Sequence, residues 1–333
     1  MKSMNISVSN PSFKIKTLPI DPPLLLAPMA GLTHSAFRRL ISELGGYGAL
    51  FTEMLSGTAL TGEDLFRSTF TKRRDCEGKV LYQLRLSGTE NMPLIFSRLK
   101  TIHPHGIDIN LGCPAPEIKR QKSGAALFDD MDRLKEVLYS CRKLWDGPLS
   151  VKCRLGINTP GWQDRFTERI RLFEQCDIDA ITVHPRFTDE KLKRKARWNL
   201  FPWITSLTSI PIIANGDIQT AQDTEKLLSE SGCKAVMLGR TAIAKPWLFN
   251  QITYGDSTPD LKQIWEKFTH YTVEDFGEYK AIGKIKKFSF YFAQNFFFNH
   301  QFHSQIISAP NLEMLLSRAQ KFLLSEPKLS KQP

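Results

Sequence analysis

The sequence predicts an α/β protein, a (β/α)8 TIM barrel followed by an all-helical C-terminal domain. Three observations support this fold. Short apolar, β-branched runs recur at a spacing of roughly 25–35 residues, with helical periodicity between most of them. These runs are continuous rather than alternating, which is typical of strands buried on both faces of a parallel sheet. Residues 261–325 carry no strand signal.

Eight apolar runs are the expected strands: 24–29, 48–53, 79–84, 106–111, 149–154, 179–184, 210–215 and 234–239. The clearest helical stretches between them are 91–101, 130–144, 165–175 and 220–230. Eight such units in about 250 residues match the usual size of a closed barrel. A doubly wound open sheet is the competing arrangement, but no GxGxxG follows the first run.

The pattern divides the chain into three parts. We expect an N-terminal extension over 1–21, the barrel over 22–253 and a separate helical domain over 254–333, with Pro259 and Pro310 as helix breakers. In the last part, lysines at 284, 286 and 287 precede a dense aromatic segment over 288–298. At this mixed helical spacing we expect most of its phenylalanines to be buried in the core of the small domain, with the lysines facing RNA.

Composition narrows the class of protein further. Of 333 residues, 41% are hydrophobic and 24% charged, which excludes a disordered or fibrous chain. Lys+Arg 45 against Asp+Glu 34 gives a net charge of +11, suited to a polyanionic partner. The six cysteines show neither CxxC nor metal-ligand spacing, so we expect no metal. No signal peptide or membrane-spanning run is found, and we expect a cytoplasmic monomer without membrane contact.

Polar residues stand at nearly every expected strand end. In barrels of this type, chemistry gathers at the C-terminal ends of the strands. Taken singly, a lysine, histidine or cysteine there is more often structural than functional. Their joint occurrence at one barrel mouth favours a site. The candidates, in chain order, are Pro28, Met29, Ala30, Gln83, Asn110, Cys113, Lys152, His184, Arg186, Asn215, Gly216, Asp217, Gly239 and Arg240.

The last two strand ends have the features of a phosphate site. Barrels often bind phosphate after strands 7 and 8. Gly216 and Gly239 let the backbone approach a phosphate closely, and Arg240 supplies a charge-assisted hydrogen bond. Lys152 and Gln83 are then placed to reach the ring system of a phosphorylated cofactor. A cation near the N1/O2 edge of a flavin stabilises its reduced anion.

The order of several motifs resembles the dihydrouridine synthases, FMN-dependent barrel enzymes that reduce uridine in RNA. The matching strings are APMAGLTHSAFRRL, FTEML, YQL, DINLGCPAPEIKRQKSGAAL, VKCRLG, TVHPR, ANGDI and VMLGR, within residues 22–250. The combination of NLGCP with ANGDI and LGR is the most specific part. The resemblance implies FMN as cofactor and NADPH or NADH as reductant. It also implies RNA as partner, with tRNA favoured, and RNA binding by the helical domain over 254–333.

The resemblance also implies roles for single residues. Cys113 would be the catalytic acid that protonates C5 of the uracil while hydride from flavin N5 reaches C6, and Asn110 would position the base. A thiol that is mostly protonated at neutral pH suits this step. The implied flavin contacts are Pro28, Met29 and Ala30 beside it, Gln83 and Lys152 at the ring, His184 near the ring or phosphate, and Asn215, Gly216, Asp217, Gly239 and Arg240 at the ribityl phosphate.

Three departures from the family pattern affect the choice of RNA more than flavin binding. Lys122 stands where the family usually has glycine, and His184-Pro185-Arg186-Phe187 replaces the common HGRT. Residues 191–197 are unusually basic. A solvated charge run is the ordinary interpretation of such a segment, but the net charge favours an RNA contact. We therefore expect the substrate to be bound by Asn110, Arg186, Lys191, Lys193, Arg194 and Lys195.

Three alternatives remain open on sequence alone. A small-molecule flavin barrel of the dihydroorotate or ene-reductase type would need neither the basic loop nor the helical tail. A flavin-free barrel could serve as a non-catalytic RNA-binding scaffold. The same chemistry could also act on ribosomal RNA.

Overall fold

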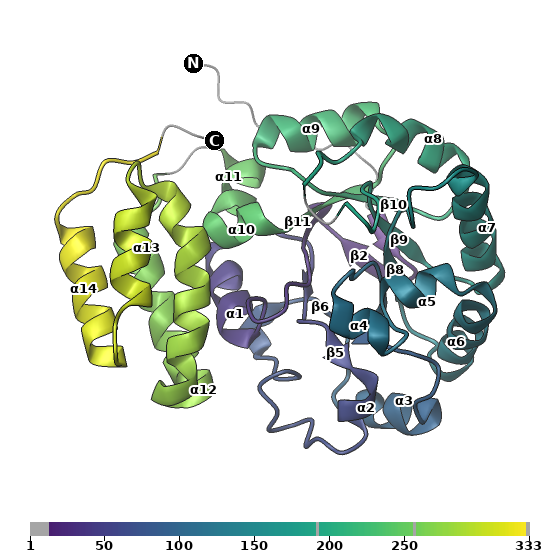
Figure 1. Cartoon of the computed structure of the whole chain (residues 1–333), viewed down its shortest axis with the longest axis horizontal. Helices are drawn as coiled ribbons and strands as arrows, with labels where there is room; N and C mark the ends of the chain where they lie inside the picture. The colour runs from purple at the N-terminus through teal and green to yellow at the C-terminus, as the bar shows by residue number, and fades with distance from the viewer. Residues whose placement is uncertain (1–12, 191–192, 256–257, 331–333) are drawn as a thin grey trace.

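A closed parallel barrel forms the larger part of the molecule (Figure 1). The computed structural model describes residues 13–190, 193–255 and 258–330. Its strands follow the order β3-β11-β10-β9-β8-β7-β6-β4. The ring closes between β3 and β4 through a parallel bridge of Leu25 with Ala49, where the Leu26 N–H donates to the Ala49 carbonyl at 3.0 Å. The predicted (β/α)8 barrel is confirmed.

The barrel strands lie within or close to the expected runs. They are β3 (Leu24–Leu26), β4 (Leu50–Phe51), β6 (Val80–Arg85), β7 (Gly106–Leu111), β8 (Leu149–Arg154), β9 (Ala180–His184), β10 (Ile212–Asn215) and β11 (Ala235–Leu238), and β5 (Leu55–Ser56) extends the pairing with β6.

Helices surround the barrel, and several begin where side chains cap them. The outer helices are α1 (Ser35–Leu44), α2 (Gly57–Leu60), α3 (Met92–Thr101), α4 (Pro116–Arg120), α5 (Ala125–Asp129), α6 (Met131–Leu144), α7 (Trp162–Gln175), α8 (Phe201–Ser206), α9 (Ala221–Glu230), α10 (Arg240–Ala244) and α11 (Leu248–Tyr254). The side chains of Asn91, Asp130 and Thr220 accept hydrogen bonds from the first turns of α3, α6 and α9. These caps explain why the predicted starts of these helices are accurate.

The interior of the barrel has two halves of different chemistry. We call the half at the N-terminal ends of the strands the lower half and the other the upper half. A short hairpin, β1 (Phe13–Ile15) with β2 (Leu18–Ile20), packs its apolar side chains against the lower half. The lower half of the barrel itself is apolar, and its buried members are Leu25, Ala27, Ala49, Phe51, Leu81, Ala180, Ile213, Ala235 and Met237. Because side chains two apart on a strand share a face, the next inward positions form the upper half, which is largely polar: Glu53, Gln83, Thr182, Asn215 and Gly239.

The C-terminal region is helical, as expected. It consists mainly of α12 (Leu261–Phe292), α13 (Asn299–Ile307) and α14 (Leu312–Leu324), and Pro259 and Pro310 precede α12 and α14. Gly277 interrupts α12 with φ 69° and ψ 159°, a conformation that suits glycine. Figure 1 shows this region beside the barrel, where α12 packs against α1 and α10.

The expected burial of most of the aromatic segment is wrong for half of its phenylalanines. Phe288, Phe292 and Phe296 are buried and pack against Trp265 and Phe302, whereas Phe290, Phe297 and Phe298 are about half exposed. The segment crosses the end of α12 and continues through a 3-10 turn, Ala293–Asn295, before α13 begins. The direction of its side chains therefore follows no single helical period.

Candidate active site

A cavity of about 190 Å³ opens among the C-terminal ends of the barrel strands. It is lined by Pro28, Ala30, Met54, Gln83, Asn110, Gly112, Cys113, Pro114, Lys152, Arg154 and His184. Seven of these, namely Pro28, Ala30, Gln83, Asn110, Cys113, Lys152 and His184, are residues that the sequence singles out. Met29, Asn215, Gly216, Asp217, Gly239, Arg240 and Arg186 do not line the cavity but follow the neighbouring strand ends.

The loop that carries Cys113 is fixed at both sides of the thiol. The Asn110 side-chain oxygen accepts hydrogen bonds from the Gly112 N–H at 3.3 Å and from the Cys113 N–H at 3.1 Å. The Cys113 carbonyl accepts from the Ala125 N–H at 3.1 Å. Gly124 has φ +62°, and a Cβ there would stand 2.9 Å from the Cys113 carbonyl oxygen, so the close return of the chain requires glycine.

A carboxyl group lies completely buried in the barrel behind this loop. Asp108, on β7, accepts from the Gln83 amide nitrogen at 2.7 Å and from the Ser150 hydroxyl at 2.6 Å. Burial raises the pKa of Asp108 from 3.8 to about 6, and the two hydrogen bonds oppose the rise. The group is therefore mostly ionised at pH 7, inside the barrel and away from solvent.

Lys152 brings a cation to the wall of the cavity. Burial, followed by the nearby Arg154 charge, lowers the pKa of Lys152 from 10.5 to about 8. Among the described residues, its ammonium group has no hydrogen-bond acceptor or ion-pair partner. The Thr182 hydroxyl, on the neighbouring strand at the same level, is buried and has no partner within the part of the chain that the structure describes. An unsatisfied cation in the wall of a cavity, as at Lys152, is typical of a binding site.

His184 is neutral at physiological pH and has a defined tautomer. Burial, reinforced by the Lys152, Arg154, Arg186 and Arg240 charges, holds the pKa of His184 well below its usual value. Its Nε2 lies 2.7 Å from Nη1 of Arg186. Because a guanidinium group only donates, Nε2 accepts and the proton of the neutral ring is on Nδ1.

An arginine–carboxylate chain continues from His184 toward the end of β11. Arg186 is buried, and besides His184 it donates to Asp217 at 2.5 Å and to the Arg194 carbonyl. Asp217 also accepts from Arg240 at 3.0 Å, and these arginines lower the pKa of Asp217. The hydrogen bonds described for Arg186 therefore all lie within the protein, while the Arg240 side chain remains half exposed.

The two glycines of the expected phosphate site differ in their surroundings. Gly216 has φ +114°, and a Cβ there would lie 2.6 Å from the His184 ring, so glycine is needed for this contact. At Gly239 the neighbouring atoms, including the sulfur of Met29 at 3.8 Å, are at ordinary contact distance. The Asn215 amide donates to the Met237 carbonyl at 2.8 Å and ties β10 to β11 below this point.

The basic loop is partly described. Lys191 lies outside the described residues, whereas Lys193, Arg194 and Lys195 are exposed. Arg197, in contrast, pairs with Glu190 at 2.7 Å and lies over the Phe187 ring at 4.8 Å. Phe187, which replaces a family threonine, is buried and packs edge-on against Trp162.

Lys122 adopts a backbone conformation that explains the usual glycine. Its φ is +52°, in the left-handed region where L side chains are strained. The loop after Cys113 thus holds a lysine in a backbone conformation that glycine adopts more readily.

The sequence interpretation gave no role to several residues that lie in or next to the cavity. Met54 and Arg154 line it, and Asp108 lies directly behind it. Asp108 and Asn110 share one face of β7, so a charged residue at this inward position was the available signal.

The turn after β3 is held from two sides, which the sequence does not reveal. Glu53, buried at the end of β4, accepts from the Gly31 N–H at 2.8 Å. From α12, Lys284 lies 3.7 Å from Glu53, and Lys287 donates to the Ala30 carbonyl at 2.7 Å. The helical region thus contacts the cavity wall directly.

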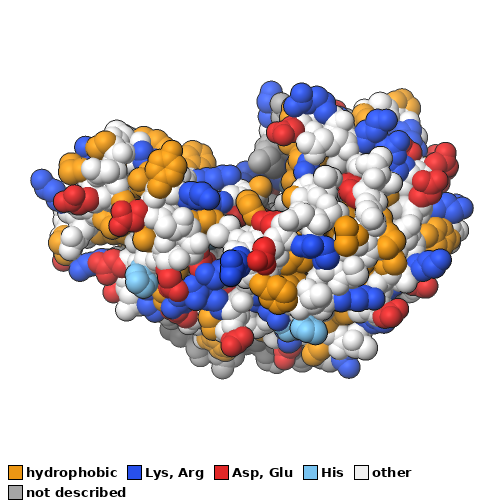
Figure 2. Space-filling model, turned by 90° about the horizontal axis from the view of Figure 1, so that it is seen from below, with side chains coloured by type: hydrophobic (Ala, Val, Ile, Leu, Met, Phe, Trp, Pro, Cys, Tyr) orange, Lys and Arg blue, Asp and Glu red, His pale blue; other side chains and the backbone are white. Residues whose placement is uncertain are grey.

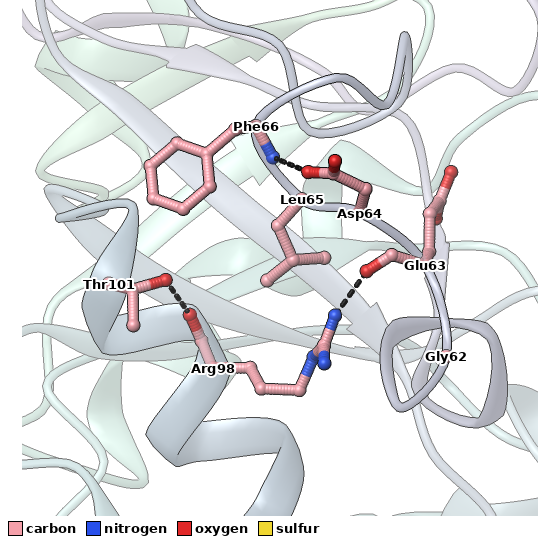
Figure 3. A pocket seen from close by; sticks show the side chains of 7 residues that line it. All are labelled: Gly62, Glu63, Asp64, Leu65, Phe66, Arg98 and Thr101. Carbon is pink, nitrogen blue, oxygen red and sulfur yellow. Dashed lines mark hydrogen bonds between the residues drawn. The ribbon is translucent and has the colours of Figure 1, made fainter.

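A second hollow, of about 450 Å³, lies away from this constellation (Figure 3). It is lined by Gly62, Glu63, Asp64, Leu65, Phe66, Arg98 and Thr101. Arg98 of α3 donates to the Glu63 carbonyl across it. Its wall contains none of the residues that the sequence singles out, so the smaller cavity at the strand ends is the candidate active site.

Two negative findings concern the described residues. In the ranges 13–190, 193–255 and 258–330, no group of three or more histidine, cysteine or acidic side chains is arranged to hold a metal ion. Within the same ranges, no helix has the length and apolar content needed to span a membrane.

Comparisons with known proteins agree with this geometry. A family profile described as "Dihydrouridine synthase (Dus)" matches residues 25–310. The chain is 32% identical over 257 residues to a "Probable tRNA-dihydrouridine synthase" of Rhodobacter capsulatus, covering 75% of this chain and 78% of that protein. It is also 32% identical over 241 residues to "tRNA-dihydrouridine synthase B" of Klebsiella pneumoniae, covering 72% and 73%. The chain therefore belongs to the dihydrouridine synthase family of oxidoreductases.

Proposed function

We propose that this protein reduces specific uridines of tRNA to 5,6-dihydrouridine, with FMN as cofactor and NADPH or NADH as reductant. The observation that carries this proposal is the cavity in which Cys113, Asn110, Gln83 and Lys152 meet. The relatives' names support tRNA as the substrate. We further propose that the protein acts as a cytoplasmic monomer, divided near residue 254 into a catalytic barrel and an RNA-binding helical domain.

The residues in and around the cavity fit both the ring system and the phosphate of FMN. Among the described residues Lys152 offers a cation without a protein partner, and Gln83 lines the same cavity. Arg240 and the Gly216 and Gly239 backbone follow the strands where barrels bind phosphate. When bound, FMN would supply hydride that originates from the nicotinamide. A cation held at the ring edge favours the reduced, anionic flavin.

The chain's own residues would do the rest of the chemistry. Cys113 would hold the proton on Sγ and release it to C5 of the uracil. Asn110 would keep the Cys113 loop in place through the two N–H bonds and lie beside the base. Pro28, Met54 and Pro114 would help to exclude water from the cavity. A uridine must leave its stack to enter, so an accessible loop of the RNA is the expected target.

A cysteine variant tests the reaction. Purified protein with FMN and NADPH should form dihydrouridine in tRNA from a strain lacking the gene, detected by mass spectrometry. Cys113→Ala should keep flavin absorbance near 450 nm but turn over roughly 10²–10⁴-fold more slowly, as expected for loss of a general acid. Cys76→Ala, at an exposed cysteine, is the matched control and should match the unmodified protein.

Other outcomes would identify the alternatives. Undiminished turnover in Cys113→Ala would remove the proposed role of the thiol. Dihydrouridine found only in ribosomal RNA, or reduction of free pyrimidines alone, would replace tRNA as the substrate. A colourless protein that still binds RNA would indicate a non-catalytic scaffold.

The RNA surface is proposed to include the exposed part of the basic loop. Figure 2 shows the molecule hollowed between the helical region on the left and the barrel, with Lys and Arg side chains on both sides of the hollow. Lys193, Arg194 and Lys195 are exposed cations beyond the end of β9. Phosphate contacts of this kind give salt-dependent affinity.

Replacing Lys193, Arg194 and Lys195 by alanine should therefore weaken tRNA binding about tenfold in 0.1 M salt. The slope of log affinity against log salt should fall in magnitude by roughly 2–3. A triple alanine variant of Lys100, Lys143 and Lys226, exposed on α3, α6 and α9, is the control and should bind as before. Equal salt slopes for the two variants would show that the basic loop makes no phosphate contact with the tRNA and is only solvated.

A further inference from the structure

A chain of hydrogen bonds links the buried carboxylate of Asp108 to the backbone of Cys113. Asp108 accepts from Nε2 of Gln83 at 2.7 Å, and Oε1 of Gln83 accepts from Nδ2 of Asn110 at 2.8 Å. Oδ1 of Asn110 then accepts from the N–H groups of Gly112 and Cys113. Two amide side chains thus connect a charge inside the barrel to the loop at its mouth.

Both ends of this chain have a fixed polarity. An ionised carboxylate only accepts hydrogen bonds, and a backbone N–H only donates. An amide side chain is asymmetric, so it can be turned by 180° wherever its neighbours allow both orientations. Between an obligate acceptor and obligate donors, only one orientation of Gln83 and one of Asn110 satisfies every bond.

Apart from its charge interaction with the nearby Lys152 ammonium group, Asp108 has no other evident task at the site. It is fully buried, and its remaining hydrogen bond comes from Ser150 on β8. It does not line the cavity, so it touches neither base nor cofactor space. An unneeded buried charge would cost several kcal/mol. The Asp108 oxygen that accepts from Nε2 of Gln83 is the acceptor that the amide chain requires.

We propose that Asp108 is a positioning residue, which through Gln83 and Asn110 sets the amide orientations that hold the Cys113 loop in its reactive place. This inference rests on the proposed function insofar as Cys113 is the acid. The positioning itself is a property of the folded chain. It can therefore be measured without turnover.

The variant Asp108→Asn changes the charge and keeps the shape. Asparagine at 108 can donate as well as accept, so the orientation of Gln83 is no longer enforced. The kcat for dihydrouridine formation should fall roughly 30-fold, as expected for a displacement of about 1 Å at the reacting group. The KM for tRNA and the flavin absorbance should stay within twofold of the unmodified protein.

Hydrogen exchange supplies a measurement that a general structural role would not move. In the FMN-loaded protein, the Gly112 and Cys113 amides should exchange roughly tenfold faster in Asp108→Asn, because their acceptor is lost part of the time. Exchange elsewhere in β7 and β8 should be unchanged. Ser150→Ala removes the other bond of Asp108 but leaves the amide chain intact, and should show neither effect.

A double variant moves the negative charge from residue 108 to residue 83, one step along the chain of hydrogen bonds. In Asp108→Asn with Gln83→Glu, the new carboxylate would accept from both asparagines and restore the orientation of Asn110. Slow exchange at Gly112 and Cys113 should return, whatever the turnover is with a charge beside the flavin space. If the single variant Asp108→Asn fails to fold, hydrogen exchange at Gly112 and Cys113 in the double variant decides whether the inference holds.

Three results would overturn the inference: an exchange rate and kcat of Asp108→Asn within twofold of the unmodified protein, equal effects in Ser150→Ala, or fast exchange in the double variant. The proposed function fails separately, if the unmodified protein forms no dihydrouridine. In that case the exchange comparison still tests the positioning by Asp108.

Discussion

The lower and upper halves of the barrel interior are built from the same strands but carry opposite chemistry. Phe51, Leu81 and Ile213 face the lower half, and two residues further along each strand stand Glu53, Gln83 and Asn215. The lower half is closed by an apolar hairpin, and the upper half opens into the cavity. One half therefore stabilises the fold, and the other holds polar groups at a cost in stability.

The buried groups whose pKa values are shifted at the site follow this division. Asp108, Lys152 and His184 all lie in the upper half, and burial is the largest cause of each of their pKa shifts. Groups whose pKa values are displaced by burial next to specific charges are typical of functional sites. The comparison predicts that mutations in the lower half lower the stability of the fold alone. Mutations of polar groups in the upper half are predicted to reduce function and can raise stability.

The largest effect is expected in the lower half. Phe51→Ala removes a fully buried ring and should lower the free energy of unfolding by about 4 kcal/mol, measured by urea denaturation. The folded fraction should keep its turnover rate at low temperature. Phe290→Ala, at a half-exposed ring, is the control and should cost under about 0.5 kcal/mol. A large loss of turnover in folded Phe51→Ala would contradict the conclusion that the lower half affects stability alone.

An intermediate effect, with a pH signature, is expected at Lys152. Its pKa of about 8 lies below the ordinary 10.5, so the folded state binds this proton less tightly than the unfolded state. Its contribution destabilises the fold below about pH 8 and disappears as the pH rises to 10.5. Lys152→Met should remove this pH dependence, raising the free energy of unfolding at pH 7 by roughly 2–3 kcal/mol after allowance for partial exposure.

The same variant should bind FMN at least about tenfold more weakly, because it loses the cation that we propose to face the flavin ring. Unfolding measured between pH 7 and pH 10, together with a flavin titration, tests both halves of the prediction. Parallel pH profiles for the two proteins, or unchanged flavin affinity, would contradict it.

The smallest effect concerns the loop above the cavity. Lys122→Gly should stabilise the protein by roughly 0.5–1 kcal/mol, since glycine removes the strain of a positive φ but loses more backbone entropy on folding. Lys119→Gly, in the helix α4 of the same loop, is the matched control and should destabilise by about 1 kcal/mol. Thermal unfolding of the pair distinguishes backbone strain from a general tolerance of glycine.

Much of the fold was predictable because it rests on local patterns. Continuous apolar runs mark β6 to β9 clearly, and capped helices such as α3 and α9 begin within a residue of their expected starts. The N-terminal hairpin was missed, because its strands have three residues each and its turn, with Lys16 at φ +55°, carries no glycine or asparagine.

The site was predictable where a polar residue lies in the last three residues of an apolar strand, as at Gln83, Lys152 and His184. It was not predictable where the cavity rests on contacts between distant segments or on a polar residue in the first half of a strand. Asp108 belongs to the second kind, and the Lys287 contact with Ala30 spans 257 residues of chain. Such contacts follow from packing and leave no periodic signal in the sequence.

The contact of Lys287 with Ala30 has a consequence for engineering this protein. The carbonyl that receives this lysine belongs to the turn at the cavity wall, and Lys284 beside it compensates the buried Glu53 carboxylate. A barrel truncated before α12 would leave that carboxylate without its cation and that turn with one support fewer. Chimaeras that exchange the C-terminal helices between relatives therefore need to transplant the lysines and their acceptors together.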